Sequence, residues 1–170
     1  MTSLEVKTAV ASYLRYQRQC LLVSFERGPD DYALEYPDVL AVTDDMRLLE
    51  VEVKISVSDF RNDSKKRKWH PSLLDRVAGR TFFYAVPREL IDAVKPCLRK
   101  GAGLMSCGSA IGYPGNVEII IKAERKADRI SPRVFMKMMR AQTGTLISLA
   151  KALVKCERGK CESKNEGEWK

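Results

Sequence analysis

The chain has 170 residues, of which 45% are hydrophobic and 31% are charged, as in a typical soluble globular protein. This length is sufficient for one domain with a normal core, which needs neither disulfides nor a structural metal. No run of about 18 apolar residues is present, which argues against a membrane span. The five cysteines are odd in number and scattered, which argues against a secreted disulfide framework. We therefore expect a cytoplasmic protein, and the formal charge of +8 favours a polyanionic partner such as DNA.

The first third of the chain predicts one helix followed by three strands. Thr2 to Glu5 has the pattern of a capping box, and apolar residues at helical spacing extend the helix to about Gln17. Strands are expected at about 20–25, 38–43 and 48–55, with turn sequences at 28–31 and 44–45. Because the connections are short, we expect these three strands to be antiparallel.

The middle of the chain predicts a helical crossover and a buried strand. Ser56 or Ser58 can begin the next helix, which carries a dense basic segment. The following elements are expected to be a short helix at 71–77, a strand at 81–86, a helix at 87–94 and a strand pair at 101–107 and 116–122. Since the strand at 81–86 follows a helix, it is expected to pair in parallel.

A last helix is expected from Ser131-Pro132, with a mostly apolar stripe of Met and Leu side chains. Such a stripe usually packs into a core, and the alternative is that it binds a protein partner. Gly144 can interrupt this helix, because glycine costs about 1 kcal/mol relative to alanine.

The segment after Cys156 is polar, so we expect a single domain over 1–155 and a disordered tail over 156–170. The order of elements predicts a three-layer α/β domain with a mixed sheet.

Charged residues alternate along the third predicted strand. Glu50, Glu52 and Lys54 share one face, because successive side chains of a strand point to opposite sides. One interpretation is the solvated face of an edge strand, where a lysine blocks further pairing. The second interpretation involves Asp38, which lies about as far before the turn at 44–45 as Glu52 lies after it. The hairpin would bring these two carboxylates together, and such a pair repels unless a cation lies between them.

Carboxylate ligands of this kind suit Mg²⁺ or Mn²⁺. Such an ion polarises a phosphate and lowers the pKa of a bound water. Lys54 can orient that water or offset negative charge on the phosphate. Glu5 is a fourth candidate, since it lies at the edge of the apolar stripe of the first helix, and its alternative role is to complete the capping box.

A basic segment follows directly on these candidates. It consists of Arg61 and then Lys65, Lys66, Arg67 and Lys68. We predict that these side chains contact a DNA backbone, and the alternative is an ordinary solvated helix face.

Pro37-Asp38 followed by Glu52-Val53-Lys54 resembles the signature of the PD-(D/E)xK nuclease superfamily. The predicted elements over about 3–87 match the αβββαβ core of its restriction-endonuclease-like fold. The segment from Val51 to Lys65, together with Phe82 to Pro87, is similar to the MmcB-related DNA-repair proteins. Related sequences place a tryptophan directly after the lysine at 65, whereas three basic residues intervene here, which leaves the roles of Asp63 and Lys65 open.

The resemblance implies a Mg²⁺- or Mn²⁺-dependent deoxyribonuclease, an endonuclease that acts in DNA repair or recombination. It implies metal coordination by Asp38 and Glu52, helped by the Val53 carbonyl, and catalysis by Lys54. Nucleases of this fold that cut branched DNA often form pairs, so a homodimer is among the expectations. The alternative is a non-catalytic DNA-binding module with a nuclease fold that works through a partner protein, which could bind the C-terminal helix.

Overall fold

The computed structural model describes residues 1–25, 37–63, 65, 80–108, 116–125 and 128–165, with side chains described as far as residue 156. The turn expected at 28–31 and the helix expected at 71–77 lie outside these residues. The chain divides into two compact units, Met1–Pro132 and Arg133–Lys170.

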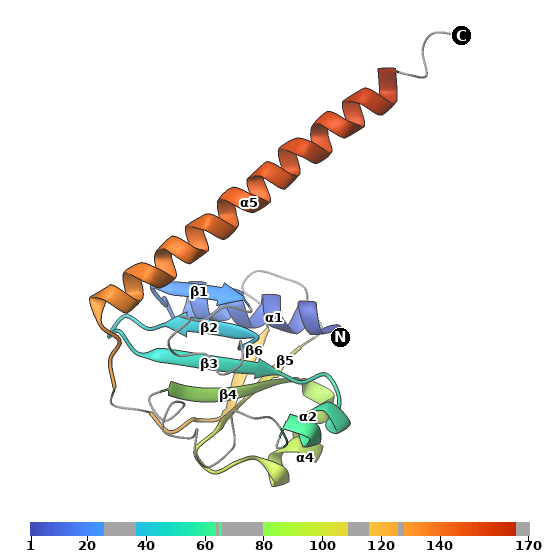
Figure 1. Ribbon diagram of the computed structural model, residues 1–170. Helices are drawn as coiled ribbons and strands as arrows, with labels where there is room; N and C mark the ends of the chain where they lie inside the picture. Colours follow the sequence, from blue (N-terminus) through green and yellow to red (C-terminus); the bar gives the residue numbers. More distant parts are fainter. Residues whose placement is uncertain (26–36, 64, 66–79, 109–115, 126–127, 166–170) are drawn as a thin grey trace. The chain divides into compact units, whose positions relative to one another are not determined.

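The first unit is built on a six-stranded sheet whose strands follow one another in chain order (Figure 1). The strands are β1 Leu22–Phe25, β2 Val39–Val42, β3 Leu48–Val53, β4 Arg80–Pro87, β5 Gly103–Cys107 and β6 Val117–Ile121. The antiparallel pairing of β1 to β3 and the parallel addition of β4 confirm the sequence-based expectation. The strand pair expected after residue 100 is also present, since β5 joins β4 in parallel and β6 closes the sheet in antiparallel.

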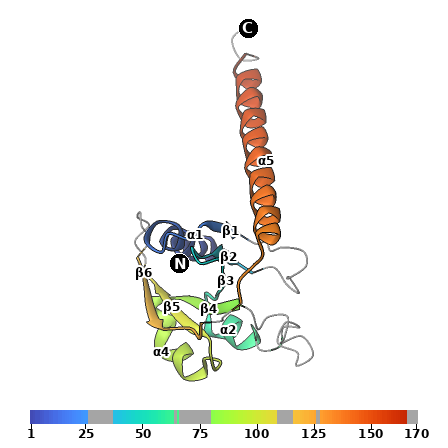
Figure 2. The same ribbon diagram turned by 90° about the vertical axis from the view of Figure 1, so that its left-hand side faces the viewer.

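Helices cover both faces of this sheet. They are α1 Ser3–Ser12, the π-helix η1 Tyr13–Gln17, α2 Val57–Asp63, the 3-10 helix η4 Arg88–Leu90, α4 Ile91–Val94 and the 3-10 helix η5 Lys95–Cys97. α1 lies on one face of the sheet, and α2 and α4 lie on the other (Figure 2). The side chains of these helices join the core cluster of the face that they cover. The first unit therefore has the three-layer, restriction-endonuclease-like α/β architecture that the sequence predicts.

Two helices begin where the capping residues predict. Thr2 Oγ1 accepts a hydrogen bond of 3.3 Å from the amide of Glu5, and Glu5 Oε2 accepts one of 2.6 Å from the amide of Thr2. This is a complete capping box, which satisfies two amides that a helix start leaves unpaired. The Ser56 hydroxyl accepts a hydrogen bond of 3.1 Å from the Asp59 amide, which caps α2.

β3 lies between β2 and β4 and is buried along its whole length. Its apolar side chains, such as Val51, join the core cluster beneath α1. Its charged side chains point to the face where Phe82, Tyr84 and Val86 form a second cluster with α2 and α4. The interpretation of this segment as a solvated edge strand is therefore wrong, because β3 pairs with a strand on each side and its charged face is covered.

The second unit contains α5, one helix of 34 residues from Pro132 to Asn165. Gly144 does not interrupt it. The sequence predicts one domain over 1–155 and a disordered tail over 156–170. In the structure the first compact unit ends at Pro132, and α5 continues past residue 155 to Asn165. None of the helices in the described ranges is long and apolar enough to cross a membrane.

Candidate active site

The candidate site lies at the end of β3, on the face of the sheet that α2 covers. Glu52 is in β3, and the Lys54 amide extends the parallel pairing by donating a hydrogen bond of 3.0 Å to the Ala85 carbonyl. Both side chains are buried, with exposed fractions of 2% and 3%, and Lys54 Nζ lies 3.5 Å from Glu52 Oε2. The structure thus places these two groups together on one face, as the alternation predicts.

Two aspartates of α2 also face Lys54. Asp63 Oδ1 lies 3.0 Å from Lys54 Nζ, and Asp59 Oδ1 lies 3.8 Å from it. Asp63 is completely buried, whereas Asp59 is 48% exposed. The sequence left the role of Asp63 open, although its spacing of four residues from Asp59 places both on one helical face. Lys54 therefore lies among three carboxylates that come from two elements.

Tyr84 of β4 fixes the position of Asp63. Its hydroxyl donates a hydrogen bond of 2.6 Å to Asp63 Oδ2. Burial, and then this contact with the carboxylate, raises the pKa of Tyr84 far above its ordinary range, so the hydroxyl keeps its proton. The rings of Phe60 and Phe82 each meet the Tyr84 ring edge to face, with centroids 4.9 Å apart. This packing restricts Tyr84, and through it Asp63, to one position.

Asp38 precedes β2 and reaches the end of β3. Its Oδ2 accepts a hydrogen bond of 2.8 Å from the Val53 amide, and its Oδ1 lies 2.9 Å from Lys7 Nζ. Val39 pairs with Val51, so one further step in the register places Asp38 opposite Glu52. The expected approach of Asp38 to this strand is present in the structure, while its role as a ligand stays a prediction.

The structure gives Glu5 and Glu50 other partners. The carboxylate of Glu5 accepts the Thr2 amide in the capping box, and it is Lys7 of the same helix that contacts Asp38. Glu50 Oε2 lies 2.6 Å from Arg80 Nη1, with exposed fractions of 1% and 6%. Glu50 shares the face of Glu52, but it belongs to a buried ion pair. Lys7 carries no motif signal, and only the packing of α1 against the sheet reveals it.

The donor chemistry of Asp38 and Glu52 fits a hard divalent cation. In the ranges that the structure describes, no three Asp, Glu, His or Cys side chains cluster closely enough to hold a metal. Mg²⁺, however, commonly binds through one or two carboxylates and retains several waters. The two carboxylates lie at the ends of adjacent strands, and each already faces an ammonium group, Lys7 for Asp38 and Lys54 for Glu52. The expected third ligand, the Val53 carbonyl, belongs to the residue whose amide Asp38 binds.

A hollow of about 340 Å³ opens beside Tyr84. It is lined by Phe60, Arg61, Tyr84, Cys97 and Arg99. Arg61 is one of the residues expected to contact DNA, whereas Arg99, from the segment before β5, was not anticipated from the sequence.

Lys65 is exposed and donates a hydrogen bond of 3.2 Å to Asn62 Oδ1. The other expected DNA contacts, Lys66, Arg67 and Lys68, lie outside the described residues.

Comparisons with known proteins bear on the fold alone. No protein-family model matches the chain, and no curated protein matches it. Among solved structures, the chain is similar to SPO1766, a protein of unknown function from Silicibacter pomeroyi. The TM-score is 0.61 at 20% sequence identity, and the match covers 92% of this chain and 94% of that chain. A function must therefore be argued from the site itself.

Proposed function

We propose that the protein is a Mg²⁺- or Mn²⁺-dependent deoxyribonuclease. The observation that carries this proposal is the environment of Lys54, a buried ammonium group next to Glu52, Asp59 and Asp63. Burial of charged groups costs free energy even when they are paired, and apolar side chains of similar volume are often at least as stable. Stability therefore does not explain such a cluster well, whereas catalysis does, because catalytic sites often gather buried titratable groups. The second carboxylate expected of a nuclease, Asp38, lies at the same end of β3.

Each residue has a defined part in the proposed reaction. Asp38 and Glu52 would hold the divalent cation together with the Val53 carbonyl, and the cation would supply Lewis-acid activation of the phosphate and a water of lowered pKa. Lys54 would orient the attacking water or stabilise the negative charge that develops on the phosphate. Asp63, held by Tyr84, would position the Lys54 ammonium group.

The positive charge near the site supports DNA as the substrate. Arg61 and Arg99 line the hollow beside Tyr84, and the whole chain carries a formal charge of +8. Guanidinium groups bind phosphates through paired hydrogen bonds, and such contacts weaken as salt rises. We extend the proposal to endonuclease activity in DNA repair or recombination, following the resemblance to MmcB-related proteins. A cytoplasmic location agrees with the free thiols of the four cysteines whose side chains the structure describes, Cys20, Cys97, Cys107 and Cys156.

The test is to incubate the purified full-length protein with linear, nicked, branched and single-stranded DNA, with Mg²⁺ or Mn²⁺. We expect cleavage by the parent and a loss of at least about 100-fold in Lys54→Met, because the variant lacks charge stabilisation at the phosphate. Lys95→Met is the matched control, since Lys95 is exposed and lies in η5. Equal cleavage by Lys54→Met and the parent would refute the catalytic assignment, provided that thermal unfolding shows both variants folded.

One observation favours a second function, that of a DNA-binding module that acts through a partner. Asp38 and Glu52 each lie within ion-pair distance of a lysine, Lys7 and Lys54, so each carboxylate already has a cationic partner without a metal. Calorimetric titration with Mn²⁺ separates the two functions. A nuclease should bind Mn²⁺, and Asp38→Asn should abolish this binding. Salt-sensitive DNA binding without Mn²⁺ binding or cleavage would favour the non-catalytic module.

We further propose that α5 pairs with α5 of a second copy of this chain. Apolar side chains recur at alternating steps of three and four, interrupted by one glutamine, at Phe135, Met139, Gln142, Leu146, Leu149, Leu153 and Cys156. This is the a and d pattern of a coiled coil. Leu146, Leu149 and Leu153 are 61%, 57% and 66% exposed.

The residues beside this stripe favour a second copy over an oppositely charged partner. The flanking e and g positions between 136 and 152 hold only Met, Thr and Ala, so two copies meet without like-charge repulsion. The basic residues Arg133, Lys137, Arg140, Lys151 and Lys155 all fall at the outer b, c and f positions. Light scattering should report a dimer for the parent and for the outer-face control Ser148→Glu, but a monomer for Leu149→Glu. A monomeric parent, or a dimeric Leu149→Glu, would contradict this pairing.

A further inference from the structure

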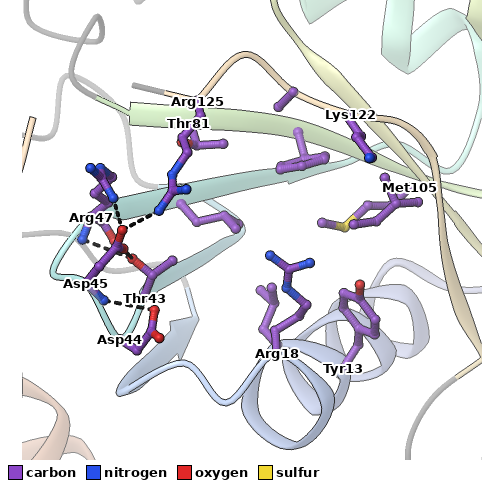
Figure 3. A pocket seen from close by; sticks show the side chains of 15 residues that line it. Tyr13, Arg18, Thr43, Asp44, Asp45, Arg47, Thr81, Met105, Lys122 and Arg125 are labelled. Carbon is purple, nitrogen blue, oxygen red and sulfur yellow. Dashed lines mark hydrogen bonds and ion pairs between the residues drawn. The ribbon is translucent and has the colours of Figure 1, made fainter. Parts of the chain in front are cut away.

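A hollow of about 400 Å³, drawn in Figure 3, lies on the α1 face of the sheet. Lys54 faces α2, on the opposite side of the sheet. The walls of the hollow come from η1, from the turn between β2 and β3, from the strands themselves and from the segment that follows β6. It shares no lining residue with the candidate active site. Its volume is within the range of pockets that hold small organic ligands, roughly 300–1,000 Å³.

The floor of this pocket is apolar. Leu49, Phe83, Met105 and Ile119 line it from four consecutive strands, β3 to β6. Phe83 supplies an aromatic ring, and its neighbour Gly103 lacks a side chain where the ring lies. A flat, apolar molecular body can rest on such a floor, because aromatic rings favour stacked or edge-to-face contact.

The rim of the pocket is polar and has an excess of positive charge. Four cationic side chains line it, Arg18, Arg47, Lys122 and Arg125, against two carboxylates, Asp44 and Asp45. Asp45 is already engaged in ion pairs with both Arg47 and Arg125. Burial, followed by the nearby guanidinium groups of Arg125 and Arg129, lowers the pKa of Arg47, as expected where positive charges crowd.

Two cations of the rim are available to a ligand. Within the described residues, the side chains of Arg18 and Lys122 form neither an ion pair nor a side-chain hydrogen bond, and both are exposed. In Figure 3 they point into the open part of the pocket, Arg18 from the end of the N-terminal helix and Lys122 from the end of β6. A dianionic group between them would meet a guanidinium and an ammonium group, both of which bind phosphate well.

The backbone is unusual beside two cations of the rim, Arg18 and Arg47. Residues Tyr13–Gln17 form a π-helix, a conformation that is rare and often found at functional sites. Gln19, directly after Arg18, and Met46, directly before Arg47, have φ angles of 51° and 64°. Left-handed conformations of residues other than glycine cost on the order of 1–3 kcal/mol and concentrate at ligand sites. Both irregular segments carry a cationic side chain of the rim.

We infer that this pocket binds a small phosphate monoester with a flat apolar body, such as a nucleoside 5′-monophosphate. The apolar floor would receive the ring system, and Arg18 and Lys122 would hold the phosphate, whose charge near −2 matches the surplus of two cations on the rim. This inference does not depend on the proposed nuclease activity, since it concerns other residues on the other face of the sheet.

The test is calorimetric titration of the full-length, metal-free protein with AMP, GMP, CMP and UMP, and with the corresponding nucleoside and inorganic phosphate as the two halves of each ligand. At least one mononucleotide should bind at least 10-fold more tightly than either half. Arg18→Glu and Lys122→Glu should each weaken this binding at least 10-fold, whereas Lys95→Glu, an exposed control in η5, should not change it.

A second variant tests the space inside the pocket without altering any charge. Ala123 lines the pocket and is only partly buried, so Ala123→Leu should fill part of the space and weaken binding while the protein stays folded. The inference would be overturned if no mononucleotide bound, if inorganic phosphate bound equally well, or if Lys95→Glu weakened binding as much as Arg18→Glu. The last two results would indicate charge attraction alone.

Discussion

Arg80 donates a hydrogen bond of 2.6 Å to Glu50 across two buried, neighbouring strands. Arg80 begins β4 and Glu50 lies within β3, in the parallel pair at the middle of the sheet. The exposed fractions of the two side chains are only 6% and 1%. The pair therefore links the crossover strand to β3 next to the candidate active site.

Removal of Arg80 alone should destabilise the protein strongly. Arg80→Met breaks the buried ion pair with Glu50 by removing one of its two charges, which typically costs about 3–5 kcal/mol. The double variant Glu50→Leu/Arg80→Met removes both charges and should recover most of that loss, because apolar replacements of buried pairs are often neutral. Urea unfolding of the parent, both single variants and the double variant measures the coupling. A double variant less stable than Arg80→Met would show that the pair is not the cause.

The hydrogen bond from Tyr84 to Asp63 leads to a second prediction. Tyr84→Phe keeps the ring between Phe60 and Phe82 but removes the donor to a buried carboxylate. The loss of one partner from a buried polar group costs about 1–3 kcal/mol. Thermal unfolding should show this decrease, while Tyr16→Phe, at an exposed position, should change stability little. Equal unfolding of Tyr84→Phe and the parent would mean that Asp63 finds another donor.

The sequence predicts the parts of this fold that depend on local patterns. The capping box at Thr2 and the period-2 alternation of Glu52 and Lys54 are properties of neighbouring residues, so they can be predicted without tertiary contacts. Burial is different, because it depends on what covers a face. The charged face of β3 looks the same in sequence whether it is solvated or covered, and the order of the strands decides between the two.

The partners of the site residues were harder to predict for the same reason. Lys7 reaches Asp38 only because α1 packs against the sheet, and Arg80 reaches Glu50 only because β4 aligns in parallel with β3. Glu5 has two plausible roles in the sequence, and the capping box accounts for its contacts in the structure. The sequence motif predicts the catalytic roles of Asp38, Glu52 and Lys54. The structure identifies the residues that contact them.

Close packing around Gly103 leads to a third prediction. A Cβ atom at this position would lie 2.3 Å from two carbon atoms of the Phe83 ring and 2.8 Å from the Ala123 amide nitrogen. Gly103→Ala should therefore displace the ring or the strand and cost about 1–3 kcal/mol, as overpacking does.

Gly144 is the opposite case, since nothing lies within 4 Å of its added Cβ and it lies inside α5. Gly144→Ala should increase helicity in circular dichroism and stabilise the helix by about 1 kcal/mol.

Alkaline pH should destabilise the protein through Cys107. Burial raises the pKa of this thiol from an ordinary value of 9.0 to about 12. Between these values the unfolded chain loses the proton while the folded chain retains it, so the free energy of unfolding falls as pH rises. The buried Tyr84 hydroxyl, whose pKa is also raised, acts in the same direction above its own ordinary value of 10.0.

Urea unfolding between pH 8 and pH 11 measures this effect. One group of this kind changes the free energy of unfolding by up to about 1.4 kcal/mol per pH unit. Cys107→Ala should reduce the slope above pH 9, whereas Cys97→Ala should leave it unchanged, because Cys97 is exposed. If both variants keep the slope of the parent, the alkaline loss of stability arises from other groups, with Tyr84 the first to examine by its ultraviolet titration.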